Sequence, residues 1–391
     1  MFRQFFTHIL FFCLLPLSAL AQSVYQLPTD GPLTVNAGLQ KLAERLLRGK
    51  QGSIVAINPA NGEVLCMVVH NKVDDNLNRA ISMTYSPGST FKVAQAATLL
   101  TFGAITTETT YPCHKGFWTN GIHIGCHDHK SPLALVQALG QSCNSWWCQA
   151  FRDFVDNRTL YPVKATALND WHDFMSSMGL GHPLGIDLPN EAGGLIPDAA
   201  YLDKSHGAWN GTTIMWLGMG QGEVTTTPLQ LCNLAAVIAN RGQWFTPHIH
   251  KPSFTHPLDS TFLTPHQARP TKEAFDIVIE GMRAAVISGT CTAIRNPHYK
   301  VCGKTGTAQN EGHDHSIFMG FAPEQKPRIA VSVYVENGGW GADLACPLGG
   351  LIMEQYILGK LSEASEAMVR KWERKNVKIK AVEVPIMLDD L

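Results

Sequence analysis

The chain is organised around one stretch, Ser86-Pro87-Gly88-Ser89-Thr90-Phe91-Lys92. A Pro-Gly turn leads into a Ser-x-x-Lys motif and then into the apolar, helix-forming run 93–100. If Ser89 begins this helix, Lys92 lies one turn further on and on the same face. A desolvated lysine can accept the proton of a serine hydroxyl, and a helix N-terminus supplies N–H groups where an oxyanion develops. The stretch therefore predicts a nucleophilic serine beside its base.

Two further stretches strengthen this prediction, Ser142-Cys143-Asn144 and Lys304-Thr305-Gly306-Thr307. Each motif alone is weak, because an exposed helix start with a solvated lysine, or a strand that ends in a turn, gives the same letters. Together they follow in the order, and at the kind of separation, that a serine acyl-transferase site needs. The three motifs thus indicate one such site.

The composition describes a globular chain long enough for one large domain or about two ordinary ones. Of its 391 residues, 45% are hydrophobic and 16% are charged, which excludes a disordered or fibrous protein. The net charge of −1 gives no electrostatic case for binding nucleic acid. The stretch Gly218-Met219-Gly220-Gln221-Gly222 lacks the spacing and the strand–helix context of a nucleotide-binding loop.

Residues 1–21 match a secretory signal peptide. Arg3 supplies the positive start, 9–17 the apolar core, and Ala19-Leu20-Ala21 the cleavage site. The apolar run is too short to span a bilayer comfortably, although an uncleaved anchor stays open. We therefore expect an exported, periplasmic protein that is soluble or peripheral on the outer face of the cytoplasmic membrane.

The chain has ten cysteines, and nine remain if Cys13 leaves with the signal peptide. An odd number leaves at least one thiol unpaired. Five cysteines sit in apolar or strand-like runs and are expected to be buried as small hydrophobic side chains, namely Cys66, Cys232, Cys291, Cys302 and Cys346.

Apolar patterns predict strands near both ends of the chain and helices between them. A hairpin is expected to join 53–58 to 63–69, and later strands are expected at 299–303, 316–321 and 328–336. The predicted helices are 34–47, 133–154, 167–180, 227–240, 273–288 and 348–358. We expect 104–130 to be irregular and the charged tail to be solvated. The pattern favours an α+β domain whose sheet is closed by its N- and C-terminal strands.

The three motifs resemble those of penicillin-binding proteins and serine β-lactamases. Other stretches resemble the transpeptidase domain of class B penicillin-binding proteins, and above all the penicillin-binding protein 2 family: Asn78-Arg79-Ala80, 185–189, 220–223, 227–230 and 303–309. The likeness covers about residues 52–358. It implies that family's α+β fold, in which helices flank an antiparallel sheet and a helical subdomain is attached.

The resemblance also implies a division of the chain. Residues 1–21 would be the signal peptide, 22–51 a short lead segment, 52–360 the transpeptidase domain and 361–391 a charged C-terminal tail. Family members usually carry a membrane helix and a long non-catalytic pedestal before the transpeptidase domain. The lead segment is too short for a typical domain, so we do not expect membrane anchoring and pedestal contacts to follow the family pattern.

The same resemblance implies a role for each motif residue. Ser89 would be acylated and Lys92 would accept its proton, which requires a partly neutral amine. Ser142 would relay a proton to the leaving D-alanine, and Asn144 would bind the substrate backbone and hold Lys92. Lys304 would be the second cation and would attract the carboxylate of a D-Ala-D-Ala peptide. The carboxylate would also be bound by Thr305 and Thr307, beside Gly306, and the oxyanion by the N–H groups of Ser89 and Thr307.

The expected activity is a D,D-transpeptidase that cross-links peptidoglycan stem peptides and is inhibited by β-lactams. Cell-wall synthesis proteins are possible partners. No cofactor is required for this chemistry. Two alternatives stay open: a β-lactamase or D,D-carboxypeptidase, in which water attacks the acyl-enzyme, and a non-catalytic penicillin-binding sensor domain.

A structural zinc is a separate possibility. Cys126-x-x-His129 has close metal-ligand spacing, with Cys113 and Cys143 on either side. Some relatives of the family resemble this chain in carrying zinc next to the active site, with the cysteine of the Ser-x-Asn triplet as a ligand. The alternative is a disulfide between Cys113 and Cys126 with Cys143 as buried packing. Three further histidines are alternative ligands, namely His114, His123 and His127.

Overall fold

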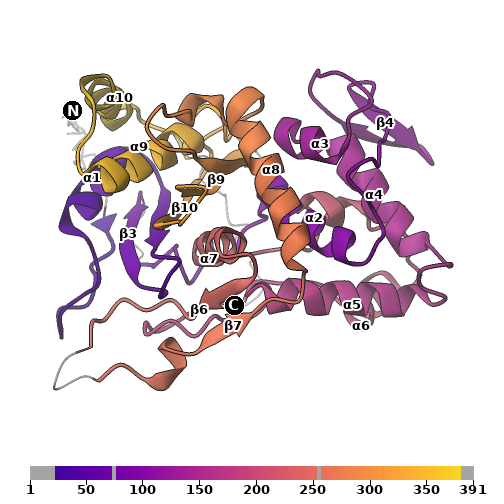
Figure 1. Cartoon of the computed structure of the whole chain (residues 1–391), viewed down its shortest axis with the longest axis horizontal. Helices are drawn as coiled ribbons and strands as arrows, with labels where there is room; N and C mark the ends of the chain where they lie inside the picture. The colour runs from indigo at the N-terminus through magenta and orange to yellow at the C-terminus, as the bar shows by residue number, and fades with distance from the viewer. Residues whose placement is uncertain (1–22, 73–75, 253–256, 311, 380–391) are drawn as a thin grey trace, which may run out of the picture.

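The computed structural model describes residues 23–72, 76–252, 257–310 and 312–379. Its central element is a fully antiparallel sheet with the strand order β1-β3-β2-β10-β9-β8 (Figure 1). The strands are β1 (Ser23–Val24), β2 (Gly52–Ile57), β3 (Val64–Asn71), β8 (Cys302–Ala308), β9 (His315–Ala322) and β10 (Ile329–Val335). Because β2 pairs with β10, the predicted closure of the sheet by strands from both ends of the chain is confirmed.

Both faces of the sheet are covered by helices, which is why its strands read as nearly continuous apolar runs. Alternate residues of β2 point to opposite cores, Ile54 and Ala56 to one and Val55 and Ile57 to the other. The first core lies against α1 (Ala37–Leu47) and α9 (Ala345–Leu358), and the second against α7 (Pro228–Ala239). The predicted α+β fold is therefore confirmed.

Most of the remaining helices form a subdomain beside the sheet, on the right of Figure 1. These helices are α2 (Lys92–Thr101), α3 (Leu135–Gln141), α4 (Asn144–Asp156), α5 (Lys164–Ser177), α6 (Ala199–His206) and α8 (Lys272–Ser288). Large aromatic side chains fill its interior, among them Trp146, Trp147, Phe151 and Trp171, all fully buried. Short elements complete the fold: η1 (Gly88–Phe91), η2 (Met215–Met219), η3 (Ser260–Phe262), η4 (Thr292–Ile294), β4 (Gly116–Thr119), β5 (Ile122–Gly125), β6 (Gln243–Phe245) and β7 (Pro265–Gln267).

Four predictions about elements were wrong. The strand expected at 299–303 begins only at Cys302 and continues through the Lys304 motif to Ala308, as β8. The single helix expected over 133–154 is two helices, α3 and α4, because Ser142 adopts a left-handed conformation with φ of 59°. The segment 104–130 is not wholly irregular, since β4 and β5 pair in it as a hairpin. The charged tail contains α10 (Glu363–Arg374), an amphipathic helix that buries Val369 and Trp372.

Helix α10 joins the end of the described chain to its beginning. It packs on α1 and α9, and the buried Lys50 amine donates to the Trp372 carbonyl at 2.6 Å. Just beyond the helix, the Val377 N–H donates to the Gly49 carbonyl at 2.9 Å. The segment expected to be a solvated tail thus packs against the lead segment and holds it in place.

Within the described residues, no helix has the length and apolar content to cross a membrane. The expected signal peptide, 1–21, lies outside the described residues.

Candidate active site

Ser89 lies on one turn of 3-10 helix, η1, and Lys92 is the first residue of α2. The turn and the helix are continuous, so Lys92 follows one turn after Ser89, as the motif predicts. Ser89 lines a cavity of about 600 Å³. Other motif residues on the cavity wall are Ser142, Asn144, Thr305, Gly306 and Thr307.

Glycines bring the Ser89 turn and strand β8 together, backbone against backbone. A Cβ on Gly88 would fall 2.6 Å from the Thr307 carbonyl oxygen, and one on Gly306 would fall 2.9 Å from Thr90 Cγ2. On the other side, the Gly88 N–H donates to the Gly220 carbonyl at 2.9 Å. Gly220 belongs to the glycine-rich stretch 218–222, which therefore supports the Ser89 turn. Only glycine permits such close approach.

The two lysines of the motifs meet at the hydroxyl of Ser142. The Lys304 amine lies 2.7 Å from Ser142 Oγ, and the Lys92 amine lies 3.4 Å from the same oxygen. Lys92 also donates to the Ser142 carbonyl at 2.9 Å and to Asn144 Oδ1 at 2.7 Å. Both lysines are fully buried. The three motifs thus converge on one hydrogen-bonded network.

Burial changes the protonation of both amines. Desolvation lowers the pKa of Lys92 to about 8. Desolvation, and then the charge of Lys92, hold the pKa of Lys304 well below its usual value. Two amines on one hydroxyl share their protons and titrate as a pair. The pair can therefore accept a proton near neutral pH, which an exposed lysine cannot do.

The local conformation at Ser142 explains how its side chain reaches both amines. Helix α3 ends at Gln141, Ser142 turns into the left-handed region, and Cys143 caps α4 by accepting from the Trp146 N–H at 3.4 Å. The chain therefore enters α4 with Asn144 as its first residue. The break between the helices exposes the Ser142 carbonyl and hydroxyl to Lys92 together.

Strand β8 forms one wall of the cavity and is an edge strand of the described sheet, since it pairs with β9 alone. Thr305 Oγ1 donates to Thr290 Oγ1 at 2.6 Å, and Thr307 Oγ1 accepts from the Gly341 N–H at 3.3 Å. Thr290 also lines the cavity. The unpaired edge of β8 can hydrogen-bond an extended peptide.

The four residues considered as zinc ligands gather beside this cavity. The ligand atoms of Cys113, Cys126, His129 and Cys143 all lie within 4.8 Å of one another. All nine described cysteines are free thiols in the structure. The alternative ligands His114, His123 and His127 lie outside the cluster. The burial expected for the other five cysteines is confirmed.

Hydrogen bonds already orient two members of the cluster. His129 Nδ1 lies 2.6 Å from the Lys130 carbonyl, which leaves Nε2 facing Cys126 Sγ at 3.5 Å. The backbone N–H of Asn144 donates to Cys126 Sγ at 3.3 Å. A hydrogen bond from the Cys143 thiol holds the pKa of Cys126 well below its usual value. The cluster therefore connects the β4–β5 hairpin region to the first turn of α4.

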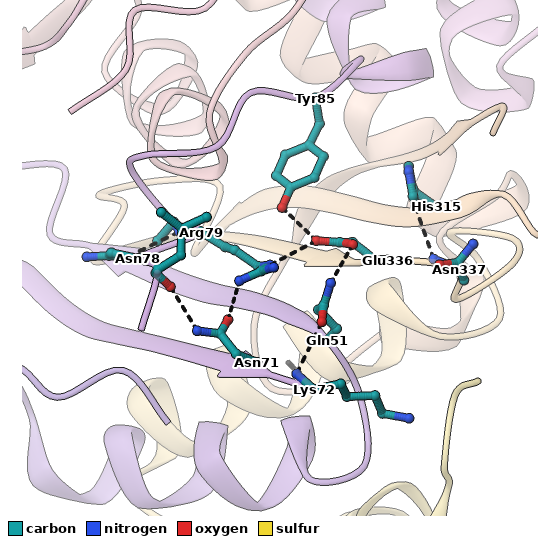
Figure 2. A network of polar contacts seen from close by, with 11 residues as sticks. Gln51, Asn71, Lys72, Asn78, Arg79, Tyr85, His315, Glu336 and Asn337 are labelled. Atoms are coloured by element: carbon teal, nitrogen blue, oxygen red, sulfur yellow. Dashed lines mark hydrogen bonds and ion pairs between the residues drawn. The ribbon is translucent and has the colours of Figure 1, made fainter. Parts of the chain in front are cut away.

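A polar network ties the segment before Ser89 to the sheet (Figure 2). At its centre is Glu336, just after β10, which pairs with Arg79 at 3.2 Å and accepts from Tyr85 Oη and Gln51 Nε2, each at 2.7 Å. Arg79 also donates to Asn71 Oδ1 at 2.7 Å. Glu336 therefore fixes the chain four residues ahead of the nucleophile.

Several cavity residues are not part of any motif. They are Trp216, Met219 and Gln221 around η2, His123 and His127 near the hairpin, and Asp314, Trp340 and Ala342 beyond β8. Sequence reasoning placed none of them at this cavity, although it named His123 and His127 as alternative zinc ligands. They come from loops that only the fold brings together. One signal was available: Trp340 stands among glycines in the sequence Gly338-Gly339-Trp340-Gly341.

Comparisons with known proteins agree with this geometry. The family model of the penicillin binding protein transpeptidase domain matches residues 52–354. The peptidoglycan D,D-transpeptidase MrdA of Acinetobacter baumannii is 32% identical over 378 residues, which cover 82% of this chain and 54% of that protein. MrdA of Escherichia coli K12 is 28% identical, over 83% of this chain and 56% of that protein. The chain thus spans little more than half the length of these relatives.

Solved structures show the same fold. Penicillin-binding protein 2 of Pseudomonas aeruginosa, in complex with WCK 5153, has a TM-score of 0.72 at 29% identity, over 85% of this chain and 77% of that one. A chain from a structure of a peptidoglycan synthase complex that coordinates polymerization and crosslinking has a TM-score of 0.73 at 27% identity. It covers 84% of this chain and 63% of that one. The present chain belongs to the family of penicillin-binding protein transpeptidase domains.

Proposed function

We propose that this chain is a D,D-transpeptidase that cross-links peptidoglycan stem peptides through an acyl-enzyme on Ser89. One observation carries the proposal: Lys92, Ser142 and Lys304 share a buried hydrogen-bond network in the wall of the cavity that Ser89 lines. The relatives named D,D-transpeptidase support it. The substrate would be a peptide that ends in D-Ala-D-Ala.

Acylation would begin with proton transfer from Ser89 Oγ to a neutral Lys92. The oxygen attacks the carbonyl carbon of the penultimate D-alanine, and the backbone N–H groups of Ser89 and Thr307 bind the resulting oxyanion. The C–N bond then breaks, and the leaving D-alanine nitrogen takes a proton from Ser142, which Lys304 replaces. The amine of a second stem peptide then attacks the ester and gives up one proton to Lys304. The C–O bond breaks as the new amide forms, and Ser89 Oγ takes back the proton held by Lys92.

The cavity also supports roles for the carboxylate-binding residues. Thr305 and Thr307 present hydroxyls along β8, and the buried Lys304 lies at their end of the strand. A terminal carboxylate in this place would be bound by hydroxyls and attracted by a cation. Asn144 would hold Lys92 through the 2.7 Å hydrogen bond and offer its amide nitrogen to the substrate backbone.

A fluorescent penicillin tests this function. The wild-type protein is expected to form a covalent adduct that persists for many minutes, and Ser89→Ala is expected to form none. Purified protein should also join a D-Ala-D-Ala donor peptide to an acceptor amine. An adduct that turns over rapidly would instead favour the β-lactamase or carboxypeptidase alternative. A stable adduct without any cross-linked product would favour the sensor domain.

The Cys113, Cys126, His129 and Cys143 cluster is proposed as a structural zinc site. Three sulfurs and one imidazole form a donor set that zinc prefers, and their mutual distances suit a tetrahedral ion. The contact between His129 Nδ1 and the Lys130 carbonyl is the kind of support that fixes a metal-binding histidine. Bound zinc would fasten the β4–β5 region to α4 and so stabilise the turn that carries Ser142; it would take no part in the chemistry.

Metal analysis of the purified protein tests the zinc site. About one zinc per chain is expected, and Cys113→Ser should lower that content together with the melting temperature. Cys232→Ser, a change at a buried cysteine outside the cluster, should leave the zinc content unchanged. Protein that folds and acylates without zinc, and loses two free thiols on oxidation, would overturn the metal in favour of the disulfide.

Location and organisation are proposed on the same basis. The signal-like residues 1–21 favour an exported, periplasmic enzyme, soluble or peripheral on the outer face of the cytoplasmic membrane. We propose 22–51 as the lead segment, 52–360 as the transpeptidase domain and 361–391 as the tail. β-Lactams are the expected inhibitors, and other cell-wall synthesis proteins are the proposed partners.

A further inference from the structure

Two free thiols that the proposed chemistry does not use lie against each other close to the wall of the cavity. Cys291 comes directly before η4, and Cys346 lies in the first turn of α9. Both side chains are fully buried, and the Cys346 thiol donates a hydrogen bond to the Cys291 sulfur. Two segments that are far apart in the sequence therefore present a pair of thiols to each other.

The packing of the surrounding elements holds the two thiols in this arrangement. Helix α9 packs on η4, and a Cβ on Gly350 would fall 2.4 Å from Ile294 Cγ2. The Cys346 N–H donates to the Gly341 carbonyl at 2.9 Å, which fixes the start of α9. Cys291 and Cys346 belong to the same apolar core. The two sulfurs therefore stay neighbours as long as this core is folded.

Polar groups around Cys291 make it the more acidic thiol of the two. Burial alone would raise the pKa of Cys291, but the hydrogen bond from Cys346 and the charge of Lys304 oppose burial. Hydrogen bonds from the Thr290 hydroxyl and the Thr305 N–H act in the same direction, and the pKa of Cys291 lies below its usual value. Burial, and then the Cys291 sulfur, hold the pKa of Cys346 well above its usual value. Cys291 is therefore the better nucleophile.

The thiol pair lies between two segments that contribute to the cavity wall. Thr290, directly before Cys291, lines the cavity. Trp340 and Ala342 also line it, and the chain enters α9, with Cys346, shortly after them. A covalent bond between the two sulfurs would therefore tie one wall segment to the other.

We propose that Cys291 and Cys346 are a disulfide-forming pair, oxidised by thiol–disulfide exchange outside the cytoplasm. The proposed export would bring the chain into a compartment where disulfides form and persist. The inference goes beyond the proposed acylation, and it needs neither Ser89 nor the zinc cluster.

The oxidant is another disulfide, carried by a small molecule or by a protein. The Cys291 thiolate attacks one sulfur of that disulfide, whose S–S bond breaks and releases a first thiolate. This thiolate takes the proton of Cys346, which then attacks the Cys291 sulfur of the mixed disulfide and displaces a second thiolate. The second thiolate takes up the proton that Cys291 had released to water. Two electrons and two protons thus pass to the oxidant, which becomes two thiols.

A peptide map tests the pair. The purified full chain is incubated for a day with reduced or with oxidised glutathione, and free thiols are then blocked. Because both sulfurs are buried, a second sample is unfolded in urea and refolded in the same two buffers, so that the oxidant has full access. The map of the oxidised samples, taken without reduction, should contain one peptide pair linked through Cys291 and Cys346. This map, unlike a count of lost thiols, distinguishes the bond from a Cys113–Cys126 disulfide.

Oxidation should also raise the melting temperature by about 5 °C, because the bond closes a long loop in the unfolded chain. Dithiothreitol should remove the linked peptide and lower the melting temperature again. Both readouts are taken on protein that forms the penicillin adduct, so that only folded chains are compared.

Four variants make the test specific. Cys291→Ala and Cys346→Ala should each lose the linked peptide and the rise in melting temperature. Cys66→Ala, a change at a buried cysteine of the same apolar core, should keep both. Cys113→Ser should keep the linked peptide, which shows that the zinc cluster is not its source.

The outcomes separate this inference from the proposed function. If both the folded and the refolded wild-type protein keep Cys291 and Cys346 as separately blocked thiols in oxidised glutathione, the pair is refuted. A rise in melting temperature that survives in Cys346→Ala also refutes it. Neither result affects the acyl-enzyme on Ser89. If fully reduced, folded protein forms no penicillin adduct, the proposed function fails while the disulfide stands.

Discussion

At the scale of the residue, the site depends on one hydroxyl between two amines. Ser142 Oγ lies within hydrogen-bond reach of both Lys92 and Lys304, and all three residues are buried. The positive charge of one amine favours the neutral form of the other, because two buried cations close to one oxygen repel each other. Reactivity at Ser89 should therefore depend on the charge of the pair.

The pH dependence of acylation follows from this arrangement. Lys92 must be neutral to accept the Ser89 proton, and its pKa is lowered to about 8. The labelling rate should therefore rise about tenfold per pH unit below that value and level off above it. Penicillin labelling between pH 6 and 9 measures this, and a flat profile over the range would contradict a lysine base.

A Ser142→Gly substitution tests the role of the hydroxyl apart from that of the left-handed backbone conformation. Ser142→Gly accepts the left-handed φ of 59° and removes only the side chain, so the protein should stay as stable as the wild type. Acylation should fall by about 10²–10⁴-fold, the usual loss for a proton-transfer group. Labelling kinetics with a parallel urea denaturation measure both effects, and a variant that acylates at the wild-type rate would remove Ser142 from the mechanism.

The placement of Lys92 one turn after Ser89 could be predicted from the sequence because that motif is local, whereas the roles proposed for the other motif residues came from the resemblance to penicillin-binding proteins. Thr290 and Asp314 could not be assigned in this way. Thr290 reaches the site because Thr305 binds it, and Asp314 because β9 begins beside the end of β8. Both placements depend on strand register, which no local pattern encodes.

At the scale of the element, the polar network around Glu336 stabilises the segment that leads to the Ser89 turn. Arg79 is almost fully buried and forms an ion pair with Glu336 (Figure 2). The same carboxylate accepts from Tyr85, four residues before Ser89. A strand end and a loop that lie far apart in sequence are thereby held together.

Removing the charge of Glu336 should lower the stability of the folded protein. Glu336→Gln leaves the Arg79 guanidinium with a weaker partner and turns an amide NH₂ toward other donors. The free energy of unfolding should fall by about 3 kcal/mol, as for other buried pairs that lose one member. Urea denaturation measures it. Asp173→Asn, which weakens an exposed pair with Arg269, should change the value by less than about 0.5 kcal/mol and serves as the control.

Most elements were predictable from periodicity and capping. Helix α7 starts where Thr227 and Pro228 predict, with a complete capping box. Helix α10 was missed because its charged face dominates the composition, while only one narrow side, with Val369 and Trp372, is buried. The break at Ser142 was missed since the apolar pattern continues across it. Tertiary contacts, not local preference, decide both cases.

At the scale of the whole molecule, the ends of the described chain meet on the side of the sheet opposite β8. Strand β8 lies at one edge of the described sheet, whereas α10 packs on α1 and α9. Trp372 is buried there, and its carbonyl binds the Lys50 amine. Stability and chemistry are therefore served by different parts of the fold.

Trp372→Ala should destabilise the protein without changing the rate of penicillin labelling. Loss of a large buried side chain should lower the free energy of unfolding by about 3 kcal/mol, while penicillin labelling at 25 °C should keep its rate because no cavity residue is touched. Leu263→Ala, at an exposed apolar position, should change neither property. A marked fall in labelling rate for folded Trp372→Ala would show that the two parts are coupled.

The free edge of β8 carries a wider consequence. An unpaired strand normally invites another chain to extend the sheet, and proteins guard against such polymerisation. Here every residue of β8 except Thr307 is buried, so the edge opens to solvent only at the floor of a recess. A single extended peptide can reach this edge, whereas the edge strand of another folded sheet is too wide to enter the recess. The chain can thus keep an unpaired strand open to a peptide without that strand pairing with another copy of the chain.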